Sequence, residues 1–146
     1  MSIETKLLDV YCDNFVAYYI FHSMHINVVG RNFESDHEML GELYEDAQAQ
    51  IDSLGEVLRT LKQKVPTTLT DITECASIKE EDTEYLSADE MLELALDVTQ
   101  KLIECYQEVI EECDDEVACA HISNLAQDRV LAHEKFAWKL RSTLES

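Results

Sequence analysis

The sequence has few of the residues that interrupt helices or identify other classes of protein. Its 146 residues include only three glycines and one proline, which favours long helices joined by few turns. No run of about 18 apolar residues occurs, so no membrane-spanning helix is expected. The first ten residues, MSIETKLLDV, lack the basic start and apolar core of a signal peptide. We therefore expect a single cytoplasmic domain over residues 1–146 with a sizeable core.

Positive charge is also scarce. Eleven Lys and Arg residues stand against 31 Asp and Glu residues, which gives a net charge of −20. Affinity for nucleic acid comes mainly from Lys and Arg that displace counterions from phosphates. Lys6 is the only such residue among the first thirty, and Glu4 and Asp9 lie beside it. The composition argues against direct DNA binding through an N-terminal tail.

The cysteines show no regular pairing pattern. Five is an odd number, and none has C-x-x-C spacing: they are Cys12, Cys75, Cys105, Cys113 and Cys119. This pattern favours free core or half-buried thiols in a reducing compartment. The alternative is a soft-metal site at Cys119 and His121, but two ligands two residues apart on a helix point in different directions.

Candidate metal ligands gather between residues 22 and 61. His22, His25 and His37 come first, followed by Asp52 and Glu56. On a helical wheel one apolar stripe contains Leu40, Leu43, Ala47, Ile51, Leu54, Leu58 and Leu61. Asp52 and Glu56 lie one turn apart on the flank of this stripe, so their carboxylates can converge on one point.

Within one chain, His37 is too far from Asp52 and Glu56 to share a metal ion with them. His37 faces the same way as Asp52 but lies roughly 22 Å away along a helix that rises 1.5 Å per residue. Two antiparallel copies that cross near Tyr44 would bring His37 of one chain against Asp52 and Glu56 of the other. The spacing therefore suggests a metal site built across a two-fold dimer.

The order of these residues resembles the ferroxidase signature of the Dps-type miniferritins. The signature segments are His25-x-Asn27, Gly30-x-Asn32-Phe33, His37-Glu38, Asp52 and Glu56, and similarity extends over roughly residues 14–142. The resemblance implies that His25 and His37 of one subunit, with Asp52 and Glu56 of its two-fold partner, are the metal ligands and catalytic residues. It also implies an iron-oxidising and iron-storing ferroxidase that uses hydrogen peroxide, or oxygen, and assembles as a dodecamer.

Two positions depart from the pattern. Members of the family commonly have an acidic residue four positions after the second histidine, where this chain has Gly41, and Trp where it has Ile26. The glycine removes a ligand of the more weakly held iron, and the isoleucine removes an oxidisable aromatic side chain. Binding at the tighter position is expected to survive, while the second iron position and the oxidation rate stay open.

The remaining pattern predicts an all-α, ferritin-like four-helix bundle. The first helix is expected over residues 3–28, and the second from a cap at Asn32 or Ser35 to Lys64, before Pro66. A long crossover with a short helix over Leu69–Ala76 follows. A capping box at Ser87-Ala88-Asp89-Glu90 begins the third helix, and Asp114-Asp115-Glu116 is expected to cap the fourth. By resemblance, Asp114, Asp115, Glu116 and Asp128 are candidate pore residues.

Other interpretations remain for some of these residues. His22 and His133 are expected to be structural, hydrogen-bonded histidines, and Trp138 is expected to pack. Glu34-x-x-His37 matches one half of a di-iron bundle motif, but the chain has no second copy, which disfavours a di-iron site within one bundle. The main rival is a structural or DNA-protecting shell with a degenerate metal site.

Overall fold

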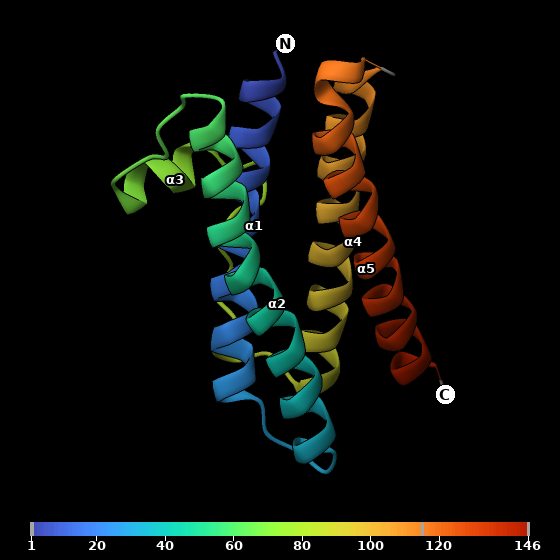
Figure 1. Cartoon of the computed structure of the whole chain (residues 1–146). Coiled ribbons are helices and arrows are strands. Elements are labelled where there is room, and N and C mark those ends of the chain that lie inside the picture. Colours follow the sequence, from blue (N-terminus) through green and yellow to red (C-terminus); the bar gives the residue numbers. More distant parts are fainter. Residues whose placement is uncertain (1, 115, 146) are drawn as a thin grey trace.

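A computed structural model of the chain describes residues 2–114 and 116–145, and every regular element in them is helical. The order is α1 (Ile3–Asn27), α2 (Phe33–Thr60), α3 (Leu69–Cys75), α4 (Ala88–Cys113), the 3₁₀ turn η1 (Val117–Cys119) and α5 (Ala120–Leu144). α1 and α2 form one antiparallel pair and α4 and α5 the other, while α3 lies outside (Figure 1). The predicted four-helix bundle with an extra helix in its crossover is confirmed. None of the described helices combines the length and the apolar character needed to cross a membrane.

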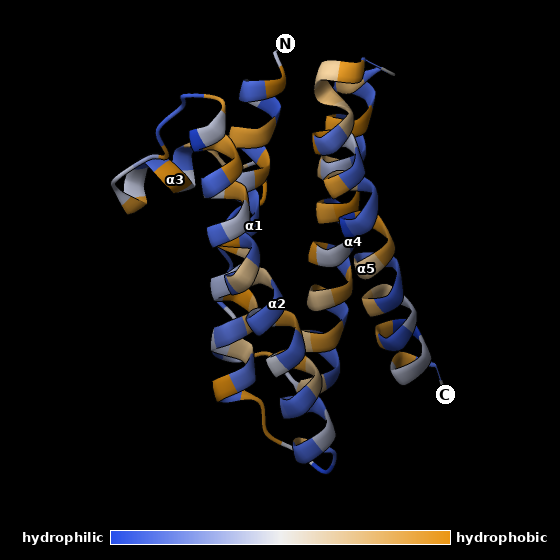
Figure 2. Cartoon of the chain, in the orientation of Figure 1, coloured by the Kyte–Doolittle hydropathy of each residue, from blue (hydrophilic) through white to orange (hydrophobic). Residues whose placement is uncertain are grey.

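The apolar faces of the long helices point into the bundle (Figure 2). The predicted stripe of α2 is buried at Leu40, Leu54 and Leu58 and partly buried at Ile51 and Leu61. In α4 and α5 buried apolar residues also recur at helical spacing, among them Val98 and Leu102 in α4 and Ile122 and Ala126 in α5. Trp138, however, is 60% exposed, so the prediction that it packs is wrong for the isolated chain.

Helix ends followed the sequence where side chains decide them. The Ser87 hydroxyl accepts a hydrogen bond from the Glu90 N–H, and the Glu90 carboxylate accepts one from the Ser87 N–H, so the predicted capping box is confirmed. The predicted end of the second helix at Lys64 is wrong, since α2 ends at Thr60. Lys62 adopts a left-handed backbone with φ of 64°, which stops the helix before Pro66 can do so.

The corner between α4 and α5 also differs from the expectation. Asp114 ends α4 in a left-handed conformation, and α5 starts only at Ala120, without a side-chain cap. The predicted capping by acids is therefore wrong; Asp115 lies outside the described residues. A disulfide joins Cys113 to Cys119, whose Cα atoms are 5.5 Å apart because η1 turns the chain back. The prediction of free thiols is therefore wrong for Cys113 and Cys119. The alternative of a soft-metal site at Cys119 and His121 is also wrong, because the Cys119 sulfur is part of the disulfide.

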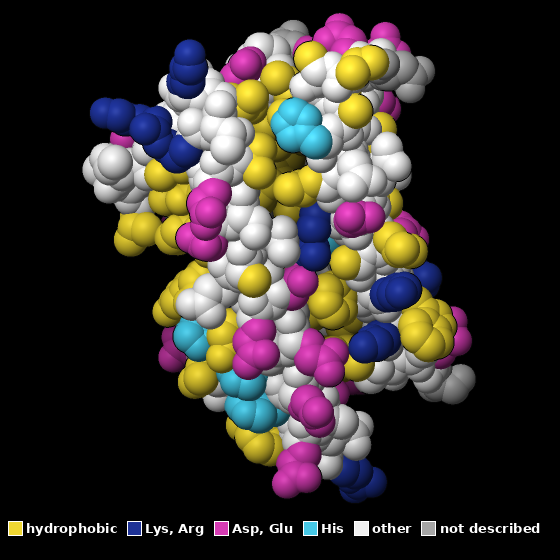
Figure 3. Space-filling model, viewed as in Figure 1, with side chains coloured by type: hydrophobic (Ala, Val, Ile, Leu, Met, Phe, Trp, Pro, Cys, Tyr) yellow, Lys and Arg dark blue, Asp and Glu magenta, His cyan; other side chains and the backbone are white. Residues whose placement is uncertain are grey.

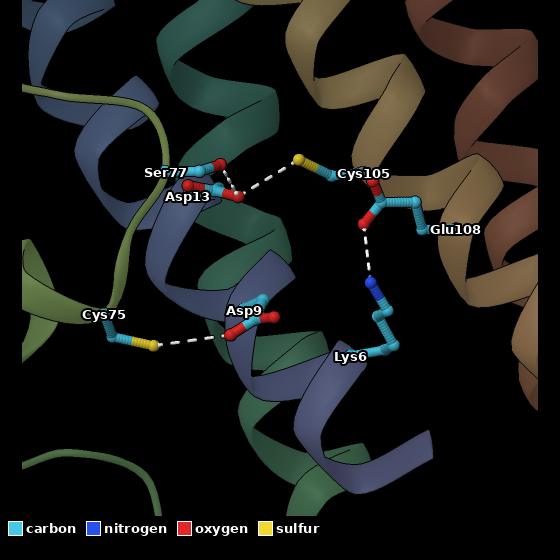
Figure 4. A network of polar contacts seen from close by, with 7 residues as sticks. All are labelled: Lys6, Asp9, Asp13, Cys75, Ser77, Cys105 and Glu108. Atoms are coloured by element: carbon cyan, nitrogen blue, oxygen red, sulfur yellow. Dashed lines mark hydrogen bonds and ion pairs between the residues drawn. The ribbon is translucent and has the colours of Figure 1, made fainter. Parts of the chain in front are cut away.

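Asp13 attaches the long crossover to the bundle (Figure 4). This carboxylate of α1 accepts hydrogen bonds from the Ile78 N–H at 2.8 Å, the Ser77 hydroxyl at 2.9 Å and the Cys105 thiol at 3.0 Å. Asp13 is only 1% exposed, and its bond to the Ile78 N–H is buried, while the bonds to Ser77 and Cys105 are partly buried. One side chain thus joins α1, the segment after α3, and α4.

A second polar cluster lies between α2 and α5. Asp46 and Arg129 form a salt bridge there, and the Lys139 ammonium lies 3.5 Å from a Glu42 carboxylate oxygen. His133 is buried beside them, and its Nδ1–H donates to the Arg129 carbonyl at 2.8 Å. The prediction of a buried, hydrogen-bonded His133 is confirmed.

Candidate metal site

Three histidines meet where α1 turns into α2. His22 and His25 lie on the last turns of α1, and His37 lies near the start of α2. Histidine side chains gather at this end of the molecule, and acidic side chains continue from it along the adjoining surface (Figure 3). Of the predicted ligands, the structure brings His25 and His37 together, with ring centroids 3.8 Å apart and planes inclined by 15°.

Each of these two histidines is oriented by the backbone of the other. His25 Nδ1 is 2.7 Å from the His37 carbonyl oxygen, and His37 Nδ1 is 2.7 Å from the His25 carbonyl oxygen. A carbonyl oxygen can only accept, so each Nδ1 must carry the proton. In the neutral rings the lone pair is then left on Nε2, the form in which an imidazole binds a metal. The pair therefore fits a divalent metal ion of borderline softness.

Aromatic side chains enclose the histidine pair. Phe33 stacks on His37 with centroids 5.0 Å apart, and Tyr44 lies 4.9 Å from His25 and 4.4 Å from His22. Sequence reasoning did not identify these contacts. The four-residue spacing between Phe33 and His37 was a usable signal, because residues four apart on a helix are neighbours. The contact of Tyr44 with α1 depends on tertiary packing and had no such signal.

Asp52 and Glu56 form the second donor pair. Both are exposed on α2. A hydrogen bond between the two carboxyl groups, and the negative charge of Asp52, raise the pKa of Glu56. The two carboxyl groups therefore converge, as the one-turn spacing predicted. Two carboxylates that repel each other across a short gap are suited to a cation, which removes that repulsion.

The carboxylate pair borders a hollow of about 470 Å³ between α1 and α2. Tyr11, Phe15 and Tyr18 line its α1 side, and Asp52 and Glu56 lie on its α2 side. The histidines are absent from this lining. Among residues 2–114 and 116–145, no three His, Cys, Asp or Glu side chains of one chain are grouped closely enough to hold a metal. One chain thus presents two separate donor pairs, His25 with His37 and Asp52 with Glu56.

The candidate pore residues are distributed around the α4–α5 corner. Asp114 and Glu116 are exposed beside the disulfide, and Asp128 is exposed further along α5. Asp115 lies outside the described residues. Their lining of a pore stays a prediction, because it depends on how copies of the chain assemble.

Comparisons with known proteins agree with this fold. A family model of the ferritin-like domain matches residues 4–146. The "DNA protection during starvation protein" of Brevibacillus brevis is 33% identical over 99% of this chain and 96% of its own length. The crystal structure of a Dps protein from Bacillus brevis has a TM-score of 0.91 and 29% identity, and covers 98% of this chain and 95% of that one. Helicobacter cinaedi CAIP has a TM-score of 0.91 and 26% identity, over 99% of this chain and 100% of that one. The chain belongs to the Dps-type miniferritins of the ferritin-like family.

Proposed function

We propose that the protein oxidises Fe²⁺ at sites shared between two subunits and stores the ferric product inside a closed shell. The observation that carries this proposal is the pair of half-sites on one chain. One offers two imidazoles with free Nε2 lone pairs, and the other offers two convergent carboxylates. Imidazole and carboxylate together suit Fe²⁺.

The surface of α1 and α2 supports a two-fold arrangement that joins the half-sites. The hollow bordered by Asp52 and Glu56 shares Phe15 and Tyr18 with a second hollow of about 710 Å³ that reaches α3. Tyr19 and Leu69, which line this second hollow, are 63% and 68% exposed. Large apolar side chains grouped in this way are typical of a surface that a partner covers. An antiparallel partner crossing near Tyr44 would cover it and would place its histidine pair at Asp52 and Glu56.

Oxidation requires that the site bind Fe²⁺ and leave some of its coordination positions open. Two Nε2 atoms and two carboxylates supply four donor groups, so positions remain for water or an oxidant. With hydrogen peroxide, two Fe²⁺ ions each lose one electron while the peroxide takes up two electrons and two protons to give two waters. This two-electron reduction limits the formation of hydroxyl radicals. Acids on the inner surface would then receive Fe³⁺ and start mineral formation.

The name of the Brevibacillus brevis relative raises direct DNA protection as a second function. This chain has 31 acidic residues against 11 basic ones, and a surface of that charge repels phosphate. We therefore propose that protection comes from the removal of Fe²⁺ and peroxide, and not from a complex with DNA.

The decisive test combines His25→Ala with His37→Ala. Fe²⁺ and peroxide are mixed anaerobically and ferric absorbance is followed with time. We expect the initial rate to fall at least tenfold in the double variant, because both imidazole donors are lost. His121→Ala, at an exposed histidine of α5, is the matched control and should keep the wild-type rate. A double variant as fast as the wild type would contradict the proposed site.

A further inference from the structure

Gly41 lies one turn after His37 and directly against the His25 ring. Gly41 is buried, although glycine is unfavourable in the interior of a helix. A Cβ atom placed on it would lie 3.0 Å from His25 Cε1 and 3.1 Å from His25 Nδ1. The ring edge of His25 therefore fills the space that a side chain at position 41 would need.

The same contact involves the hydrogen bond that orients His25. In an α-helix the carbonyl of residue 37 faces the N–H of residue 41. His25 Nδ1–H reaches this carbonyl at 2.7 Å by passing over Gly41, while the ring stacks on His37 at 3.8 Å. Any side chain at position 41 would push against a ring that is fixed by both contacts. The His25 ring could move away only by lengthening its hydrogen bond or separating from His37.

We propose that Gly41 is a positioning residue that holds the histidine pair in its ligating form and sets the site to one divalent ion per chain. The inference rests on the proposed function. At the position where the resembled family commonly carries an acid, a Cβ would lie 3.0–3.1 Å from the His25 ring, so an acidic side chain could be added here only by moving that ring. Four donor groups remain, two imidazoles and two carboxylates, which are enough for one ion.

For Gly41→Asp, a missing ligand and a positioning role predict opposite results. A simple missing ligand would be restored by this change, and the protein would gain a second ion per chain. If Gly41 positions His25, the aspartate instead displaces the ring, weakens binding at least tenfold and adds no ion. Anaerobic calorimetric titration with Co²⁺ measures both stoichiometry and Kd, and the visible Co²⁺ spectrum reports changes in coordination. A second ion bound with the first Kd unchanged would overturn the proposal.

Gly41→Ala separates positioning from ligand chemistry, because alanine adds a Cβ and no donor. Alanine also favours helix over glycine, so weaker Co²⁺ binding cannot be ascribed to a weakened α2. We expect Kd to rise several-fold in Gly41→Ala. Binding identical to the wild type would overturn the proposal.

A double-variant cycle on the metal-free protein gives a readout independent of metal binding. Gly41→Ala is made in the wild type and in His25→Ala, and the thermal midpoints are compared. With the ring removed, alanine should stabilise α2, whereas with the ring present it should not. We expect the two effects to differ by about 3 °C or more. Equal effects in both backgrounds would overturn the contact between Gly41 and His25, while unchanged metal binding in His25→Ala with His37→Ala would instead overturn the proposed function.

Discussion

At the scale of single residues, the buried ionisable groups between the helix pairs respond to pH. Burial, and then the positive charge of Arg129, lower the pKa of His133 to about 4. The groups facing it are Arg129 and Asp46, which pair with each other, and the buried Tyr106, whose pKa is raised by burial. His133 is therefore neutral in the folded chain at neutral pH.

This neutrality predicts a loss of stability in acid. In the unfolded chain the pKa of this histidine is near 6.5, so it is protonated at pH values where folded His133 is still neutral. The free energy of unfolding therefore decreases as the pH falls from about 6.5 to 4. At pH 5 the free energy of unfolding is lowered by about 2 kcal/mol through this residue. Urea unfolding at pH 7 and pH 5 measures it, and His133→Gln should reduce the difference. His121→Gln, at an exposed position of the same helix, should leave the difference unchanged.

Residue chemistry was predictable where it depended on spacing along one helix. The convergence of Asp52 and Glu56 follows from their one-turn separation, and the burial of His133 follows from its place in an apolar stripe. The contact between Gly41 and the His25 ring was not predictable in this way. It lies between α1 and α2 and depends on how these two helices pack against each other. The sequence alone showed only that position 41 lacks the acid common in the resembled family.

At the scale of the elements, the α4–α5 corner departs most from the sequence pattern. The run of acids looked like a helix cap, yet the chain uses a left-handed Asp114, a 3₁₀ turn and a disulfide. Cys119 lies six positions after Cys113, a spacing that no helix or strand periodicity identifies. The capping box at Ser87 could be predicted because its two hydrogen bonds are local.

The disulfide should stabilise this corner through the unfolded chain. The crosslink lowers the conformational entropy of the unfolded chain, and for so short a loop this adds about 2 kcal/mol to the free energy of unfolding. Cys113→Ser with Cys119→Ser should therefore lower the thermal midpoint, and a phosphine reductant should lower it in the wild type but not in the double variant. Thiol titration of the denatured, non-reduced wild type should detect only Cys12, Cys75 and Cys105. Five reactive thiols in that titration would contradict the bond.

At the scale of the whole molecule, the chain leaves surfaces that its own fold does not cover. Tyr19 and Leu69 border the hollows on the α1–α2 side, and Leu131 and Trp138 are exposed on α5. These two regions belong to opposite helix pairs (Figure 1). Each region exposes large apolar side chains of the kind that a partner chain covers, which is consistent with a homo-oligomer.

Light scattering should therefore detect a particle of about 200 kDa, which corresponds to twelve copies of the 16.8 kDa chain. The net charge of −20 per chain makes the assembly sensitive to ionic strength, so the measurement is made at 0.15 M salt, where the screening length is about 8 Å. A single chain in solution would contradict both the shell and the shared metal site, since one chain holds the two donor pairs apart.

The carboxylate of Asp13 also constrains the order in which the fold can form. Its bonding partners lie 64, 65 and 92 residues away along the chain. None of them is available to an isolated helical hairpin, so this acid remains hydrated until distant parts of the polypeptide have come together. The returning segment before α4 can therefore be held in place only once it has come back to α1, and the third bond of Asp13 forms only when α4 has also reached α1.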